Sequence, residues 1–169
     1  MAQKKPTVAI TGANGFVGRA LIEALGDRFH IVGLTRGIPG AAQRKSDDNI
    51  EWRSCDLYSM LDAEEGLKGV DYAFYLVHSM MPSARLTPAK FEDLDLLLAD
   101  NFARAAEKNG VKQIVFLGGI TPQTSELSAH LRSRLEVELA LGSRSTPVTA
   151  IRAGLIVGPG GSSFTIDTQ

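Results

Sequence analysis

The sequence predicts a doubly wound α/β fold, in which a parallel sheet of order 3-2-1-4-5-6 carries helices on both faces. Strand-like segments alternate with helical ones along the chain, which requires right-handed crossovers between parallel strands. Residues 72–77 form a nearly continuous apolar run, typical of a strand covered on both faces. The first strand leads directly into a glycine-rich turn and a helix. Since 169 residues suffice for one domain, we expect residues 1–169 to form a single unit.

The first half of the chain contains four expected strands, at 7–11, 30–35, 50–54 and 72–77. A helix over 15–25 places four apolar residues on one face at helical spacing: Val17, Leu21, Ile22 and Leu25. A second helix ends near Leu67, because Ser59 can cap its start and acidic residues follow in its first turn. The polar segment 37–49, with two glycines and a proline, indicates a loop.

The second half begins with a loop at 82–88 and a long helix over 89–109, which Asn109 and Gly110 end. Its expected apolar stripe is Leu94, Leu97, Leu98, Phe102 and Ala105, and its expected solvated face carries Asp93, Asp95 and Asp100. A strand over 113–117, a loop over 118–127, a helix over 128–141 and a strand over 148–151 follow. The remaining residues are rich in glycine and serine.

Composition and charge exclude several classes of function. The net charge of −1 gives no general attraction to nucleic acid or to an acidic membrane surface. The N-terminus lacks the apolar segment of a signal peptide, and no apolar run is long enough to span a bilayer. The single cysteine, Cys55, is expected to be a buried and inert thiol. Because one cysteine allows no disulfide within the chain, which fits a reducing compartment, the cytoplasm is the expected location. The three histidines lack the spacing of a metal site.

The glycine-rich turn is the main candidate binding site. Gly12 can adopt backbone angles that a side chain forbids, Gly15 lets the main chain approach a ligand, and Gly18 allows close packing of helix on strand. The unpaired N–H groups at the helix start, together with the helix dipole, favour a phosphate anion. This arrangement predicts a dinucleotide pyrophosphate site, and a glycine turn without a ligand is the alternative.

Several segments together resemble the atypical, extended short-chain dehydrogenases/reductases, of NmrA-like or NAD-dependent epimerase/dehydratase type. They are the turn segment 11–18 (TGANGFVG), 34–36 (LTR), 55–57 (CDL), 75–79 (YLVHS), 110–116 (GVKQIVF), 151–154 (IRAG) and 158–160 (GPG). The resemblance covers nearly the whole chain and implies a Rossmann-type NAD(P)-binding domain. It also implies a substrate region after the last strand, which we expect to be absent or truncated in this chain.

The resemblance assigns cofactor contacts along the carboxyl ends of the strands. The implied binding residues are Thr11, Gly12, Asn14, Gly15, Phe16, Val17, Gly18, Arg36, Asp56, Leu57, Val77 and His78. Arg36 ends the second strand, where a guanidinium suits the 2′-phosphate of NADP, and Arg44 and Lys45 can add charge. We therefore expect NADP, with NAD as the alternative. Asp56 would meet the adenine amino group and Leu57 the ring; a plain turn aspartate is the other interpretation.

The catalytic positions depart from the family pattern. Members typically carry a Ser or Thr after the fifth strand and a Tyr-x-x-x-Lys on the next helix, where the tyrosine is the general acid/base. Here Gly119 occupies the hydroxyl position, with Thr121 as the nearest substitute. His130 stands in the tyrosine position and Arg134 in the lysine position, so these two and Thr121 are the candidate catalytic residues. A guanidinium nearby would favour a neutral imidazole.

A structural interpretation competes with this catalytic one. Arg132 with Glu136, and Arg134 with Glu138, are spaced as surface ion pairs on one helix. His78, at the end of the fourth strand, can equally be a packed or hydrogen-bonded residue. Asn101 fits a structural asparagine of the family and receives no catalytic role.

The sequence thus predicts NADP-dependent hydride transfer on a small carbonyl or quinone-like substrate, without a nucleic-acid partner. A homo-oligomer is compatible with the sequence. Two alternatives stay open: a non-catalytic NADP(H) sensor that acts through a partner, and a nucleotide-sugar epimerase or dehydratase.

Overall fold

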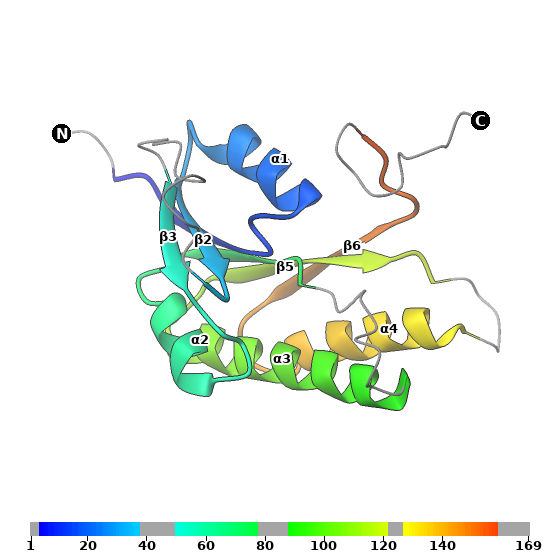
Figure 1. Cartoon of the computed structure of the whole chain (residues 1–169). Helices are drawn as coiled ribbons and strands as arrows, with labels where there is room; N and C mark the ends of the chain where they lie inside the picture. The colour runs from blue at the N-terminus through cyan, green and yellow to red at the C-terminus, as the bar shows by residue number, and fades with distance from the viewer. Residues whose placement is uncertain (1–3, 38–49, 78–87, 122–126, 159–169) are drawn as a thin grey trace.

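The computed structural model describes residues 4–37, 50–77, 88–121 and 127–158. Within them lies a six-stranded parallel sheet of order β3-β2-β1-β4-β5-β6, as predicted (Figure 1). Its strands are β1 (Thr7–Thr11), β2 (His30–Thr35), β3 (Ile50–Ser54), β4 (Tyr72–Tyr75), β5 (Gln113–Gly119) and β6 (Val148–Ala153). The order reverses between β1 and β4, so their carboxyl ends form the switch point where doubly wound folds bind ligands.

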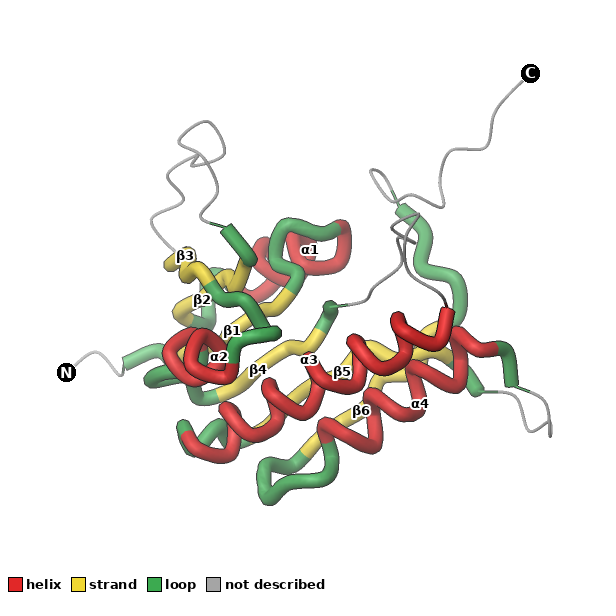
Figure 2. Tube along the Cα trace, turned by 60° about the horizontal axis from the view of Figure 1, so that its bottom comes forward, coloured by secondary structure: helices red, strands yellow, loops and turns green. Residues whose placement is uncertain are grey.

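Helices cover the two faces of the sheet unequally. α1 (Phe16–Leu25) lies on one face, and α2 (Met60–Gly66), α3 (Pro88–Lys108) and α4 (Ala129–Leu141) lie on the other (Figures 1 and 2). α3 and α4 run side by side on this second face, in front of the sheet in Figure 2. A serine caps the N-terminus of each of two helices. Ser59 Oγ accepts from Asp62 N–H at the start of α2, and Ser128 Oγ accepts from Leu131 N–H at the start of α4.

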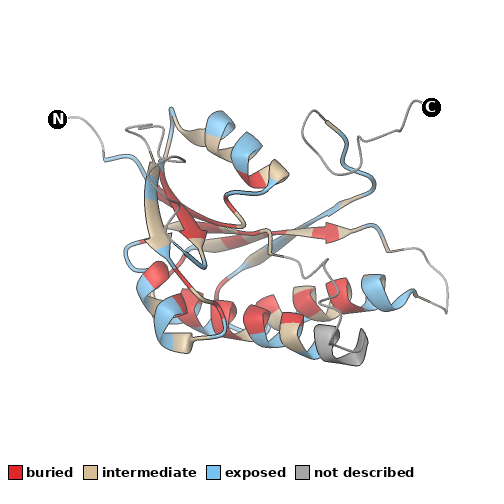
Figure 3. Cartoon of the chain, viewed as in Figure 1, coloured by how far each residue is buried: buried red, intermediate tan, exposed pale blue. Residues whose placement is uncertain are grey.

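The core consists of two layers separated by the sheet. Val8 and Ile10 of β1 pack toward α1, against Leu21, Ile22 and Leu25 of the predicted helical face. The intervening Ala9 belongs to the larger cluster on the opposite face, which includes residues of α2, α3 and α4. Figure 3 shows this burial along the central strands and on the sheet-facing sides of the helices.

Three strand ends differ from the prediction. β4 ends at Tyr75 rather than at Val77, because the Leu76 N–H bonds a side chain instead of a neighbouring strand. β5 and β6 are longer than predicted, because Gly118 and Gly119, expected in a loop, pair with Arg152 and Ala153. A strand that ends on glycines gives little apolar signal in the sequence.

The buried face of α3 follows the predicted stripe in part, since Leu98, Phe102 and Ala105 are buried as predicted. The prediction is wrong for Leu97, which is 45% exposed, and for Asp95, which is expected on the solvated face but is only 5% exposed. Further alanines of the helix are also buried, so small residues contribute much of its packed side. Asn101 is structural as predicted, since its Nδ2 donates to the Leu57 carbonyl at 2.9 Å.

The segment after β6 rises toward α1 (Figure 1). A Cβ built on Gly158 would lie 2.7 Å from Phe16 Cζ, so this segment reaches the first residue of α1. Among the described residues, we find no helix with the length and apolar character needed to cross a bilayer.

Candidate nucleotide site

The turn between β1 and α1 has the geometry of an anion-binding helix start. Gly12 has a φ of +67°, in the left-handed region, and its carbonyl accepts from the Gly15 N–H at 2.8 Å. Gly15 is the N-cap of α1, and no side chain caps this helix start within the described part of the chain. The N–H groups of Phe16 and Val17, at the first helical positions, therefore remain for a ligand.

Gly18 shows that the turn is closed tightly against the helix. A Cβ at this position would lie 2.4 Å from the Gly12 carbonyl oxygen and 2.7 Å from Ala13 Cα. Both are backbone atoms, which cannot move away without opening the turn. The turn thus fits a dinucleotide pyrophosphate, because its curvature requires glycine in the pattern that such sites use.

The adenosine end of the predicted site lies beyond β2 and β3. Arg36 directly follows β2 and is exposed to solvent. The Asp56 carboxylate accepts the Tyr58 N–H at 3.1 Å, which is the turn contact of the alternative interpretation and leaves the predicted adenine contact untested. Leu57 is buried in the larger core cluster, so the predicted contact with the adenine ring also stays a prediction. Arg44, Lys45 and His78 lie outside the described residues.

The end of β4 is held by side chains from both sides. On the β1 side, Thr11 Oγ1 accepts the Leu76 N–H at 2.8 Å and donates to the Phe74 carbonyl at 3.2 Å. On the β5 side, Arg134 Nη1 donates to the Val77 carbonyl at 3.4 Å, and its Nη2 donates to the Leu117 carbonyl. The Thr11 hydroxyl, predicted at the cofactor, is thus committed to β4 and is 1% exposed.

Arg134 is not the surface residue of the structural interpretation. It is 8% exposed, and its Cζ lies 4.6 Å from the centroid of the Phe116 ring. The predicted pair with Glu138 is wrong, because Glu138 binds Arg152 of β6 at 2.6 Å instead. Arg132 and Glu136 likewise form no ion pair within the described ranges.

A buried acidic residue accompanies this guanidinium. Burial lowers the pKa of Arg134 from its ordinary value, and the negative charge of Asp95 opposes that change. Burial likewise raises the pKa of Tyr75, with Asp95 adding to the effect. Asp95, Tyr75 and Arg134 therefore form a polar group within the apolar core, between β4, α3 and α4. Spacing alone does not predict this group, because the pattern of α3 places Asp95 on the solvated face with Asp93 and Asp100.

The other two candidate catalytic residues, like Arg134, lie near the carboxyl ends of the strands. His130 is exposed in the first turn of α4, one helical turn before Arg134 and on the same side of the helix. Thr121 lies two residues after β5 and is half-buried. A Cβ on Gly119 would meet Leu131 Cδ2 at 3.1 Å, so α4 packs directly over the position where the family carries a hydroxyl.

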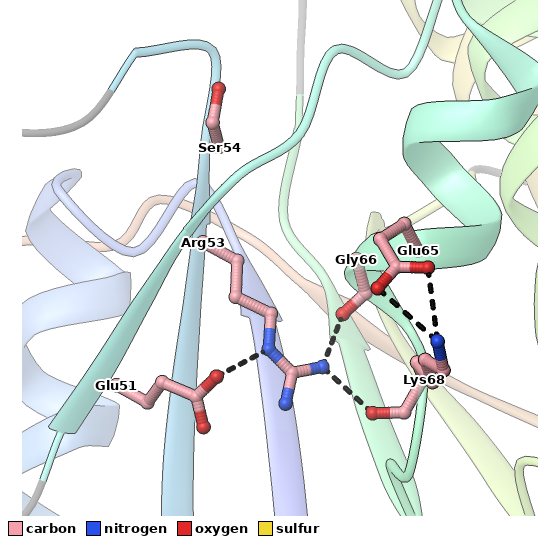
Figure 4. A pocket seen from close by; sticks show the side chains of 6 residues that line it. All are labelled: Glu51, Arg53, Ser54, Glu65, Gly66 and Lys68. Carbon is pink, nitrogen blue, oxygen red and sulfur yellow. Dashed lines mark hydrogen bonds and ion pairs between the residues drawn. The ribbon is translucent and has the colours of Figure 1, made fainter.

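A separate hollow lies between β3 and the end of α2 (Figure 4). Its central group is Arg53, whose Nη1 donates to the carbonyls of Gly66 and Lys68 at 3.0 and 2.7 Å, and whose Nε donates to Glu51 at 2.7 Å. Arg53 thereby supplies donors to the carbonyls that α2 leaves unpaired at its C-terminal end. We interpret this hollow as a helix cap, separate from the glycine turn.

Cys55 is buried as predicted. Burial raises the pKa of its thiol to about 11, with the charges of Asp62 and Asp56 adding to the effect. A Cβ on Gly66 would lie 2.9 Å from its Sγ, which shows how closely α2 packs over it. Its thiol is therefore no candidate nucleophile.

The family model described as "NAD dependent epimerase/dehydratase family" matches residues 8–129. The chain belongs to this family. The match begins in β1, includes the whole glycine turn and ends in the first turn of α4, which confirms the resemblance inferred from the turn and the strand ends.

The known proteins that resemble this chain are longer than it is. The Auxiliary protein GraX of Staphylococcus aureus is 28% identical over 117 residues, which cover 68% of this chain and 37% of that protein. UDP-N-acetylglucosamine 4-epimerase from Bacillus cereus has a similar structure, with a TM-score of 0.68, 24% identity and coverage of 88% of this chain and 53% of that one. Triphenylmethane reductase from Citrobacter sp., complexed with NADP(H), gives a TM-score of 0.72 at 21% identity, over 88% of this chain and 50% of that one. The chain thus spans about half the length of these solved structures.

Proposed function

We propose that this chain is the nucleotide-binding part of an NADP(H)-dependent oxidoreductase. The observation that carries the proposal is the turn over residues 12–18, which is closed so tightly that Gly18 leaves no room for a Cβ. Its uncapped helix start would hold the pyrophosphate, and the rest of the dinucleotide would extend along the carboxyl ends of the strands. Membership of an NAD-dependent family supports this cofactor class.

Arg36 supports NADP over NAD. It follows β2, where dinucleotide-binding folds of this class bind the adenosine ribose, and its exposed guanidinium can form paired hydrogen bonds with a 2′-phosphate. An acidic residue at this position would instead accept from the 2′-hydroxyl of NAD. The adenine would lie against the chain near Asp56 and Leu57.

The reaction we propose is reduction of a small carbonyl or quinone-like compound. The nicotinamide, when bound, supplies the hydride. His130 is the proposed proton donor, because it is exposed at the nicotinamide edge and imidazole exchanges protons near neutral pH. Thr121 carries the hydroxyl nearest in the sequence to Gly119, so we assign it the substrate hydrogen bond.

The test begins with calorimetric titration of NADPH and NADH into the full-length protein. NADPH oxidation is then followed at 340 nm with a panel of carbonyls and quinones. We expect NADPH to bind, and His130→Ala to slow turnover by about 10²–10⁴-fold, the usual contribution of a general acid. His30→Ala is the matched control, since His30 is exposed at the opposite edge of the sheet, where it contacts Glu51. If neither NADPH nor NADH binds, the proposal is contradicted.

A second candidate is an NADP(H) sensor that acts through a protein partner without turnover. Three observations favour it. Arg134, in the position of the family lysine, is bonded to backbone carbonyls, and Gly119 provides no hydroxyl. The relative from Staphylococcus aureus is named an auxiliary protein. Tight NADPH binding with no oxidation across the panel supports this candidate.

An epimerase or dehydratase acting on a nucleotide sugar is the remaining proposal. Its signature is an isomerised product without net consumption of cofactor, so product analysis separates it from the reductase. We further propose a cytoplasmic location, to which the buried free thiol of Cys55 is suited, and leave a homo-oligomer to be tested by light scattering.

A further inference from the structure

The residues that follow β4 are positioned by side chains rather than by the sheet. The last pairs of the β4 ladders are Ile10 with Phe74 and Tyr75 with Phe116. Beyond them, the Leu76 N–H bonds the Thr11 hydroxyl, and the Val77 carbonyl bonds Arg134. The chain therefore leaves the sheet at a defined point and in a defined direction.

Arg134 joins two neighbouring strands through one planar group. Its two Nη atoms reach the carbonyls of Val77, after β4, and of Leu117, in β5. A guanidinium presents several donors in a fixed fork, whereas the ammonium of lysine is a single point charge on a flexible stem. The Phe116 ring packs against the guanidinium, and Asp95 balances its charge within the core. This arrangement therefore depends on arginine, because a lysine could not donate to both carbonyls through one planar group.

The joined strand ends border the proposed nucleotide site. A Cβ built on Gly12 would lie 3.5 Å from the Leu76 carbonyl oxygen, so the residues after β4 lie against the glycine turn. On the other side, Leu117 leads through Gly118 and Gly119 to Thr121. A dinucleotide whose pyrophosphate lay at the glycine turn would extend its other half over these two ends.

We propose that Arg134 is a positioning residue that sets the width of the nicotinamide side of the site by bridging the ends of β4 and β5. It replaces the ribose contact that its place in the family motif implies. This inference rests on the proposed function, in which a nicotinamide dinucleotide lies over these strand ends.

The decisive variant is Arg134→Lys, because lysine is the residue that the family pattern places here. Calorimetry compares wild-type protein and variant with two ligands: the tighter-binding of NADPH and NADH, and the matching adenosine phosphate without the nicotinamide half (adenosine 2′,5′-bisphosphate or AMP). We expect the dinucleotide to bind at least about tenfold more weakly to the variant and the adenosine phosphate to change by less than about twofold. Arg132→Lys, exposed on the same helix, is the matched control and should change neither.

Two results overturn the inference while leaving the proposed function intact. If Arg134→Lys binds the dinucleotide as wild type does, a ribose contact suffices and the bridge is unnecessary. If both ligands lose affinity equally, Arg134 supports only the fold. If the wild-type protein binds neither dinucleotide, the proposed function itself fails.

A measurement on the unmodified protein applies even where the variant does not fold. In ¹⁵N-arginine-labelled protein, the bridge predicts slowly exchanging Nη protons for Arg134 both without and with nucleotide. Rapid exchange of these protons in the nucleotide-free protein overturns the inference.

Discussion

The two halves of the candidate site differ in what builds them. In the pyrophosphate half, backbone meets backbone: the space beside Gly18 is filled by the Gly12 carbonyl and Ala13 Cα. In the proposed nicotinamide half, side chains form the close contacts instead. Arg134 bridges the ends of β4 and β5, and Gly119 faces the flexible end of Leu131. Backbone packing leaves one residue type possible, whereas side-chain packing admits several solutions. The first half therefore keeps its family pattern in this chain, and the second departs from it.

Gly18→Ala should have the largest effect of any single substitution in the site. Its Cβ would overlap backbone atoms 2.4 and 2.7 Å away, so the turn must open, at a cost of about 1–3 kcal/mol or more in unfolding free energy. We expect nucleotide affinity to fall more than tenfold. Urea denaturation and calorimetry measure the two effects. Gly142→Ala is the control, since its nearest contact would be an ordinary 3.5 Å; equal effects at both glycines would remove the basis of the comparison.

Arg36→Asp tests the adenosine end of the site, where the proposed contact is made by a side chain next to the backbone-built turn. Loss of a charge-assisted hydrogen bond, worth about 1.5–3 kcal/mol, should weaken NADPH binding by roughly ten- to a hundredfold while NADH is little affected or favoured. Competition titrations with the two nucleotides report the ratio directly. Equal losses for both would refute the assignment of Arg36 to the 2′-phosphate.

Gly119→Ser restores the hydroxyl that the family carries and addresses the side-chain-built half. The added Cβ would meet only Leu131 Cδ2 at 3.1 Å, which can rotate away, so we expect less than about 1 kcal/mol of destabilisation. If the chain belongs to a reductase, turnover should rise or stay constant. A loss of stability as large as that of Gly18→Ala would show that both halves are equally rigid.

Asp71→Asn should have the smallest effect, because it lies at the amino-terminal edge of the sheet. The Lys112 ammonium at 2.8 Å and the Thr7 N–H at 2.9 Å hold the pKa of Asp71 below its ordinary 3.8. A lowered carboxylate pKa adds stability above pH 3.8, and that stability is lost as the pH falls through the folded-state value. We expect the variant to lose about 0.2–1 kcal/mol at pH 7 and the difference to vanish in stronger acid.

Urea denaturation across this pH range measures the Asp71→Asn effect, with the exposed Asp27→Asn as control. Nucleotide affinity should be unchanged, which provides a baseline for the other variants. A constant difference at every pH would mean that the Asp71 charge is not responsible.

The sequence predicts the fold and the shape of the glycine turn well, because both depend on local patterns, whereas the pyrophosphate contact stays a prediction. Gly12 has a positive φ and Gly18 leaves no room for a Cβ, and strands that alternate with amphipathic helices indicate a parallel sheet. The roles of Arg134 and Asp95 could not be predicted from spacing. Their partners lie on β4 and β5, far away in the chain, and both residue types usually face solvent.

Because α2 packs over Cys55, labelling of this thiol can measure local opening of the protein. The thiol is the sole cysteine of the chain, it is 3% exposed, and its raised pKa keeps it protonated at neutral pH. An alkylating reagent therefore reaches it when local opening, such as separation of α2 from the sheet, exposes the sulfur, and the labelling rate reports the free energy of that opening. Because Asp56 and Leu57 follow Cys55 directly, a nucleotide that binds against them would stabilise the closed state and slow the labelling without touching the sulfur.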